Sequence, residues 1–169
     1  MGLIQRLFGT DRNGNSAALY EAIVARGRDP HWYLDGGVAD TMDGRFDMIT
    51  LILALVLIRL ETNAGQAEFS VALTEHFITD MDAQLRQEGI GDVGLGKHVG
   101  QMMSMLGGRL TAYRQGLDTH DLAPALSRNL YRGNPPGPQA MAHVTAELDR
   151  FAAGLRAAPS DTLTKGKLP

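Results

Sequence analysis

Apolar residues recur at intervals of three and four along most of the chain, which is the pattern of helices that bury one face. The first clear stretch covers residues 16–26, follows a polar, turn-like segment at 10–15, and has Asn15 or Ser16 as its N-cap. A proline then breaks the pattern, and the glycine- and aspartate-rich segment at 30–44 is predicted to be a structured loop.

The next segment, at residues 44–61, is apolar nearly all round, which predicts a helix at the buried centre of a bundle, with Asp43 as its N-cap. Its longest apolar run is Met48–Ile58, at about 11 residues, whereas a membrane-spanning helix needs about 20. The segment is therefore predicted to form the core of a soluble protein rather than a membrane span.

A third helix is predicted from about residue 66 to a C-cap at Gly89, and a fourth carries the stripe Val99–Leu117. A short helix at about 121–131 ends at a Gly- and Pro-rich break, and a last one carries Met141–Leu155.

No segment alternates as a strand would, so the predicted fold is all-α: a single-domain bundle of about six helices with a buried central helix. The expected organisation is an N-terminal segment at 1–15, a helical domain at 16–157 and a disordered tail at 158–169.

Charge and cysteine content exclude several classes of function. The chain carries 16 Lys and Arg against 19 Asp and Glu, a formal net charge of −3, so no nucleic-acid partner is predicted. It has no cysteine, which excludes disulfides, thiolate catalysis and iron–sulfur clusters and is consistent with a reducing compartment.

The N-terminal segment is too short and too soon interrupted to be a secretory signal. The apolar residues at positions 3–8 share one helical face. They favour a first helix that packs on the body, with a short amphipathic helix on a membrane surface as the alternative.

Two glycine motifs imitate nucleotide-binding loops. Residues 89–94 match the dinucleotide fingerprint, and residues 91–98 match a phosphate loop except that His98 replaces Ser or Thr. Because the preceding element is an amphipathic helix rather than a strand, the glycines indicate a helix end and a tight turn. No cofactor is predicted.

The sequence also lacks the usual signatures of catalysis and metal binding. No two histidines lie four residues apart, no Glu-x-x-His motif is present, and no serine lies in an elbow motif. The protein is predicted not to be an enzyme. A helical-bundle metalloenzyme that uses Glu75, His76, Asp80 and Asp82 is the alternative from a different class of function, and a peripheral membrane adaptor led by the N-terminal helix is the other.

Two features of the fourth helix indicate close packing. Gly107 and Gly108 lie in its interior, where a pair of glycines costs about 2 kcal/mol, so another helix or a partner segment is expected to approach there. Two of the methionines at 102, 103 and 105 follow the core spacing, so core packing is favoured for this cluster, with an adaptable binding surface as the alternative.

The stretch Gly37–Asp47 reads GVADTMDGRFD and resembles the G-V-x-D-T-x-D-G-R-F-D stretch of the ubiquinol–cytochrome c chaperone family. Weaker similarities follow in the same order at 80–82, at 85–92 and at Gly108-Arg109 with Ala112-Tyr113. Order and spacing agree over residues 16–118. One departure is the middle of the central helix, where the family often has a histidine and this chain reads TLIL.

The resemblance implies an all-helical, non-enzymatic assembly factor for ubiquinol–cytochrome c reductase, respiratory complex III. Mitochondrial members act with a small partner subunit near the ribosome and receive newly made cytochrome b. The same client is implied here, with the ribosome, a small partner subunit and peripheral membrane contact as further expectations. The absence of a transit peptide suggests a bacterial member, located in the cytoplasm and peripheral to the inner face of the inner membrane.

The resembling segments supply the candidate partner-binding residues: Asp40, Thr41, Asp43, Arg45, Phe46, Arg86, Asp92, Arg109 and Tyr113. In the favoured interpretation the aspartates 40, 43 and 47 form an intramolecular network with Arg45 that caps the central helix. In the alternative, the arginines 45, 86 and 109 donate to carboxylates or carbonyls of a client. Both interpretations can hold for different residues.

Overall fold

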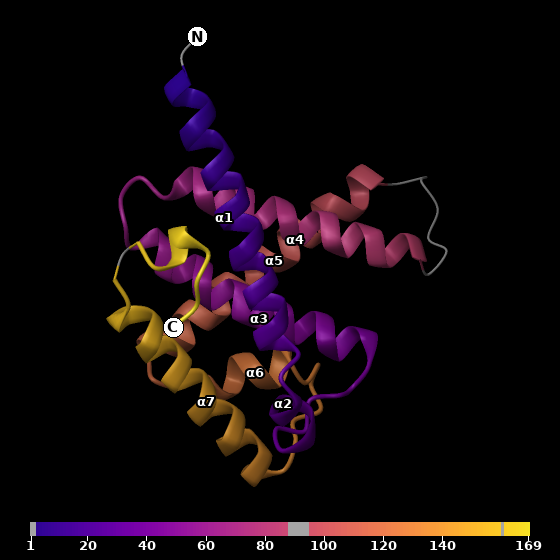
Figure 1. Cartoon of the computed structure of the whole chain (residues 1–169). Helices are drawn as coiled ribbons and strands as arrows, with labels where there is room; N and C mark the ends of the chain where they lie inside the picture. Colours follow the sequence, from indigo (N-terminus) through magenta and orange to yellow (C-terminus); the bar gives the residue numbers. More distant parts are fainter. Residues whose placement is uncertain (1–2, 88–94, 160) are drawn as a thin grey trace.

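The computed structural model describes the backbone of residues 3–87, 95–159 and 161–169, and the side chains of 14–84, 86–87, 97, 99–159 and 161–169. This part of the chain forms seven α-helices and one 3-10 turn and contains no strand, which confirms the all-α prediction (Figure 1). The helices are α1 (Leu3–Gly27), α2 (Pro30–Leu34), α3 (Met42–Glu61), α4 (Ala67–Gln87), α5 (Leu95–Asp118), α6 (Ala123–Asn129) and α7 (Pro138–Ala157). None of the helices in the described ranges combines the length and the apolar character needed to cross a bilayer.

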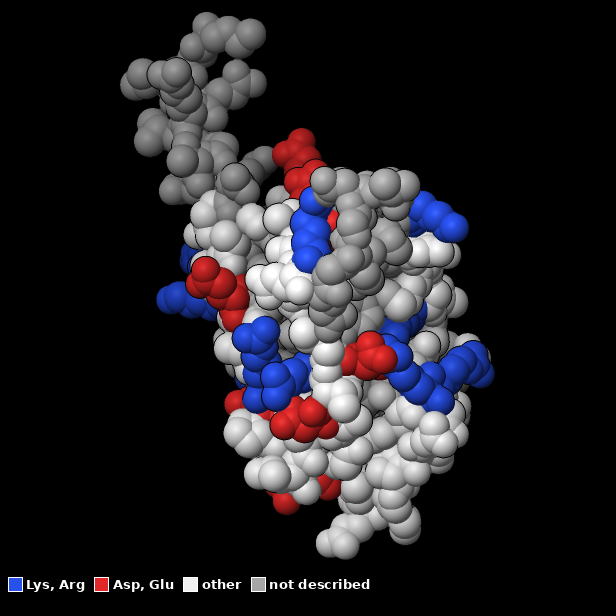
Figure 2. Space-filling view, turned by 90° about the vertical axis from the view of Figure 1, so that its right-hand side faces the viewer, with Lys and Arg blue, Asp and Glu red and all other residues white. Residues whose placement is uncertain are grey.

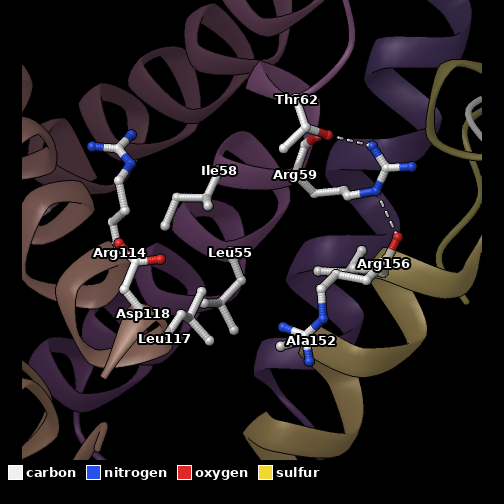
Figure 3. A pocket seen from close by; sticks show the side chains of 10 residues that line it. Leu55, Ile58, Arg59, Thr62, Arg114, Leu117, Asp118, Ala152 and Arg156 are labelled. Carbon is white, nitrogen blue, oxygen red and sulfur yellow. Dashed lines mark hydrogen bonds between the residues drawn. The ribbon is translucent and has the colours of Figure 1, made fainter. Parts of the chain in front are cut away.

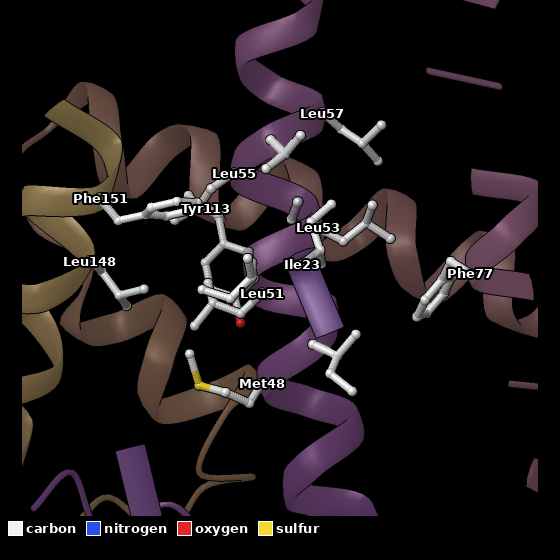
Figure 4. Packing of buried hydrophobic residues seen from close by; sticks show 14 of the residues in the cluster. Ile23, Met48, Leu51, Leu53, Leu55, Leu57, Phe77, Tyr113, Leu148 and Phe151 are labelled. Carbon is white, nitrogen blue, oxygen red and sulfur yellow. The ribbon is translucent and has the colours of Figure 1, made fainter. Parts of the chain in front are cut away.

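Helix α3 is the buried centre of the bundle, as its uniformly apolar sequence predicts. Every residue from Asp47 to Leu57 is buried. Figure 4 shows α3 between Phe77 of α4 on one side and Tyr113 of α5 with Phe151 of α7 on the other. The N-cap is Thr41 rather than the predicted Asp43, because the Thr41 hydroxyl accepts the Gly44 N–H at 3.1 Å.

Helix α1 is continuous through residues 10–15, so the turn predicted there is wrong. Ser16, expected as a cap, is buried inside the helix and lies 3.2 Å from Nε2 of His76 on α4. The one-turn helix α2 also lies in the predicted loop. It begins with Pro30 and is anchored by the buried Trp32, whose indole N–H donates to the Arg26 carbonyl at 2.8 Å.

Residues 161–169 of the C-terminal tail pack on α1, contrary to the expected disorder. The 3-10 turn η1 (Leu163–Lys165) buries Leu163 in the core cluster. The Arg26 guanidinium donates to the carbonyl of Pro169 at 3.1 Å. Burial of Leu163 and this hydrogen bond together anchor the segment to the body of the protein.

The glycines of α5 do not mark close packing within the chain. A Cβ added at Gly107 or Gly108 would meet nothing within 4 Å, and both residues are exposed. A Cβ at Gly44, by contrast, would overlap the carbonyl oxygen of Ala39. One close approach that needs glycine is therefore where the 37–41 loop meets the first turn of α3. Of the methionines at 102, 103 and 105, Met102 is buried, Met105 is half-buried and Met103 is exposed.

Candidate functional site

The most buried charges of the described residues lie between α3, α5 and the loop after α6. The Asp47 side chain on α3 is 1% exposed, and its Oδ1 accepts from Nη2 of Arg109 on α5 at 2.6 Å. Its Oδ2 accepts from Nε of Arg132 at 2.6 Å. Arg132 also reaches the exposed Asp43 at 2.7 Å. This charge cluster links segments that are 62 and 85 residues apart in the sequence.

The geometry of the charge cluster indicates that it stabilises the fold. Both carboxylate oxygens of Asp47 are paired, which compensates for their removal from water. The Arg109 guanidinium lies 5.5 Å from the centre of the Phe46 ring, a cation–π contact. The bond to Asp47 raises the pKa of Arg132. Sequence reasoning missed Arg132, because a lone arginine in a polar loop gives no sign of a partner 85 residues away.

The predicted network around the start of α3 exists with a different set of pairs. Arg45 binds Asp40 at 2.7 Å on the surface, while Asp43 and Asp47 pair with Arg132 instead of Arg45. Thr41 caps the helix. These contacts support the intramolecular interpretation for this loop and leave Asp40 and Arg45 accessible, since both side chains are more than half exposed.

The remaining candidate residues do not gather at one place. Arg86 pairs with Asp82 at 2.8 Å on the far part of α4, and Asp92 lies outside the described residues. Tyr113 is fully buried, its hydroxyl has no hydrogen-bond partner among the described residues, and burial raises its pKa. Arg109 and Tyr113 are therefore inaccessible to a partner in this conformation. A partner-binding role for the exposed candidates stays a prediction.

The acidic face of α4 does not form the metal centre of the alternative interpretation. Asp80 accepts from the Tyr20 hydroxyl at 2.7 Å, and His76 faces Ser16 of α1. Burial, and then the bond to Asp80, raise the pKa of Tyr20. Within the described ranges no three potential metal-binding His, Cys, Asp or Glu side chains come together. Glu75 points into a surface groove instead.

A cavity of about 210 Å³ between α3, α5 and α7 has arginines around an apolar floor (Figure 3). Arg59 donates to the carbonyl of Leu155 at 2.7 Å and to the hydroxyl of Thr62 at 2.8 Å. It thereby satisfies a carbonyl in the last turn of α7, which is a structural function.

A second depression lies between α3, α4 and α5 and is here termed the α4–α5 groove. Its volume is about 400 Å³, and its lining is predominantly apolar. Val71 is 57% exposed and Met103 45% exposed, so the groove presents apolar side chains to solvent. The groove is lined by Leu57, Glu61, Ser70, Val71, Thr74, Glu75, Ile78, Met103 and Leu110.

The charged side chains on the face shown in Figure 2 are mixed in sign. Basic and acidic groups alternate, with uncharged surface between them. Such a face gives no extended positive field of the kind that binds a polyanion.

The fold and the sequence match known proteins. Residues 34–168 match the family described as Ubiquinol-cytochrome C chaperone. The chain belongs to the ubiquinol–cytochrome c chaperone family. Its structure is similar to the crystal structure of the Cbp3 homolog from Brucella abortus, with 31% identity, a TM-score of 0.86, and coverage of 98% of this chain and 95% of that chain. A search among curated proteins finds no match.

Membership of the chaperone family confirms the interpretation of the Gly37–Asp47 stretch. The matched range includes that stretch, all four residues of the charge cluster and the α4–α5 groove. The whole of α1 precedes the matched range, although the 31% identical structure covers nearly the whole chain.

Proposed function

We propose that this protein is a non-enzymatic chaperone that binds newly made cytochrome b and supports the assembly of ubiquinol–cytochrome c reductase. The observation that carries the proposal is the family match over residues 34–168, together with the 31% identical Cbp3 homolog. The α4–α5 groove adds physical support, because a chaperone for a membrane protein needs an apolar surface on a fold that stays soluble.

The protein acts, in this proposal, on the cytoplasmic side of the inner membrane, where a bacterial integral membrane client is inserted. The ribosome, a small partner subunit and the membrane surface are proposed as further partners. Asp40 and Arg45 are proposed as a second contact surface, because their ion pair is exposed and can exchange for a pair with a partner.

Deleting the gene in its host tests the proposal. We expect assembled complex III and the haem spectrum of cytochrome b to fall, while other respiratory complexes stay at normal levels. Re-expression of the full chain is the control and should restore both signals. Unchanged cytochrome b in the deletion strain would contradict the proposed function.

A further inference from the structure

We propose that the α4–α5 groove is the docking site for an apolar helical segment that ends in Lys or Arg. The inference rests on the proposed function and adds the place and the chemistry of client binding. Its occupant is the end of a client transmembrane helix at which the positive residues lie, because the cytoplasmic flanks of such helices are enriched in Lys and Arg.

The walls of the groove are two parallel stripes of side chains. On α4, Val71, Glu75 and Ile78 recur at four and three residues and share one helix face. On α5, Met103 and Leu110 are seven residues apart and face them across the groove. Leu57 of α3 forms part of the floor, so a helix placed here would contact apolar groups of three helices.

Gly107 makes close approach of a helix feasible. It falls between Met103 and Leu110 on the groove side of α5, four residues after one and three before the other. A Cβ there would meet nothing within 4 Å, so no contact within the chain explains a glycine in this helix interior. Small residues on one helix allow the backbone of a second helix to approach closely, which explains the glycine if the groove is occupied.

The charges that line the groove favour the positively charged end of a client helix over its other end. The described residues that line it include two carboxylates and no Lys or Arg. Glu61 is already bound by Arg114. The exposed carboxylate of Glu75 has no hydrogen-bond or ion-pair partner among the described residues, and is available for an incoming cation.

Peptide binding to the full chain tests the chemistry. The probe is a labelled helical peptide of Leu and Ala with three Lys at one end, and its control carries three Glu instead. We expect the Lys-ended peptide to bind about fivefold more tightly at low salt, with a smaller difference at high salt. Glu75→Gln should remove most of the difference. Equal affinity for the two peptides would overturn the charge argument.

A pair of glycine substitutions tests the location. Gly107→Leu places a side chain in the groove, whereas Gly108→Leu places it on the polar outer face of α5 with Ser104 and Thr111. Both positions are open, so both variants should fold and melt no earlier than the parent chain. We expect Gly107→Leu to weaken binding by about tenfold or more and Gly108→Leu to leave it unchanged. Equal affinities of the two variants would overturn the docking site.

Photo-crosslinking in host cells separates this inference from the proposed function. A photoreactive residue replaces Met103 in the groove or, as a control, Leu34, which is 82% exposed on α2. We expect cytochrome b to be trapped from position 103 and not from 34. Trapping from position 34 alone, or trapping of a second copy of this chain from 103, would overturn the docking site while the deletion experiment still decides the proposed function.

Discussion

The buried carboxylate of Asp47 should be the most sensitive polar position in the fold. Asp47→Asn removes the charge that compensates Arg109, whose side chain is 8% exposed and has Nη1 without a partner among the described residues. Breaking a buried ion pair from one side typically costs about 3–5 kcal/mol. For a chain of this length, that loss lowers the melting temperature by about 6–20 °C.

Asp43 is the matched control, since it is also an aspartate paired with Arg132 but has a side chain 71% exposed. Asp43→Asn should cost at most about 1 kcal/mol, because water already solvates both partners. Urea unfolding followed by circular dichroism measures both variants at one pH and salt concentration. Equal losses, or a loss below about 1 kcal/mol for Asp47→Asn, would refute the burial argument.

A double variant, Asp47→Asn with Arg109→Met, completes the test. Removing both buried charges leaves no uncompensated ion, and the methionine keeps much of the arginine's apolar volume. We expect it to recover most of the stability lost in the single variant. Arg109→Met alone completes the cycle. If the double variant loses as much stability as Asp47→Asn and Arg109→Met added together, the two side chains are not coupled and the charge argument fails.

Three further predictions concern the packing of the bundle. Gly44→Ala should lower the free energy of unfolding by about 2 kcal/mol or more, since the new methyl overlaps the carbonyl of Ala39. Gly108→Ala should raise the free energy of unfolding by about 1 kcal/mol, and urea unfolding measures both variants. Leu163→Ala should cost about 2–3 kcal/mol and increase proteolysis of the C-terminal tail, and no change would show that the tail is not anchored. Tyr113→Phe should leave stability at pH 7 equal or higher, because the hydroxyl has no described partner. Burial raises the pKa of Tyr113, so above about pH 10 the unfolded chain loses a proton that the folded chain keeps, and stability falls by about 1.4 kcal/mol per pH unit; the phenylalanine variant should show a smaller fall.

The hydrophobic pattern predicted the fold class and the central helix because nearly every residue in the buried stretch of α3 from Asp47 to Leu57 is apolar. The polar residues at 10–15 predicted a turn, because the sequence pattern does not show that Ser16 contacts His76 on α4. The prediction of a disordered tail was wrong for the same reason, since the contact of Leu163 with the core depends on the position of α1. Local pattern thus predicts elements, while long-range partners decide where they begin and end.

The candidate partner-binding residues also show the difference between what local sequence predicts and what long-range contacts decide. Charge and resemblance pointed to Asp43, Arg45 and Arg109, yet the pairing depends on Arg132, whose position the sequence does not indicate. The α4–α5 groove was missed because Met103 fits the spacing of core residues and Val71 falls outside the apolar stripe of its helix. Only the packing of α4 against α5 shows that both side chains stay exposed beside one groove.

Pulse-labelling followed by capture of the tagged full chain from its host tests the central claim most directly. We predict that newly made cytochrome b is captured during the pulse and leaves the chaperone during the chase, as complex III accumulates. Labelled material without cytochrome b, or cytochrome b held equally at all times of the chase, would contradict the account.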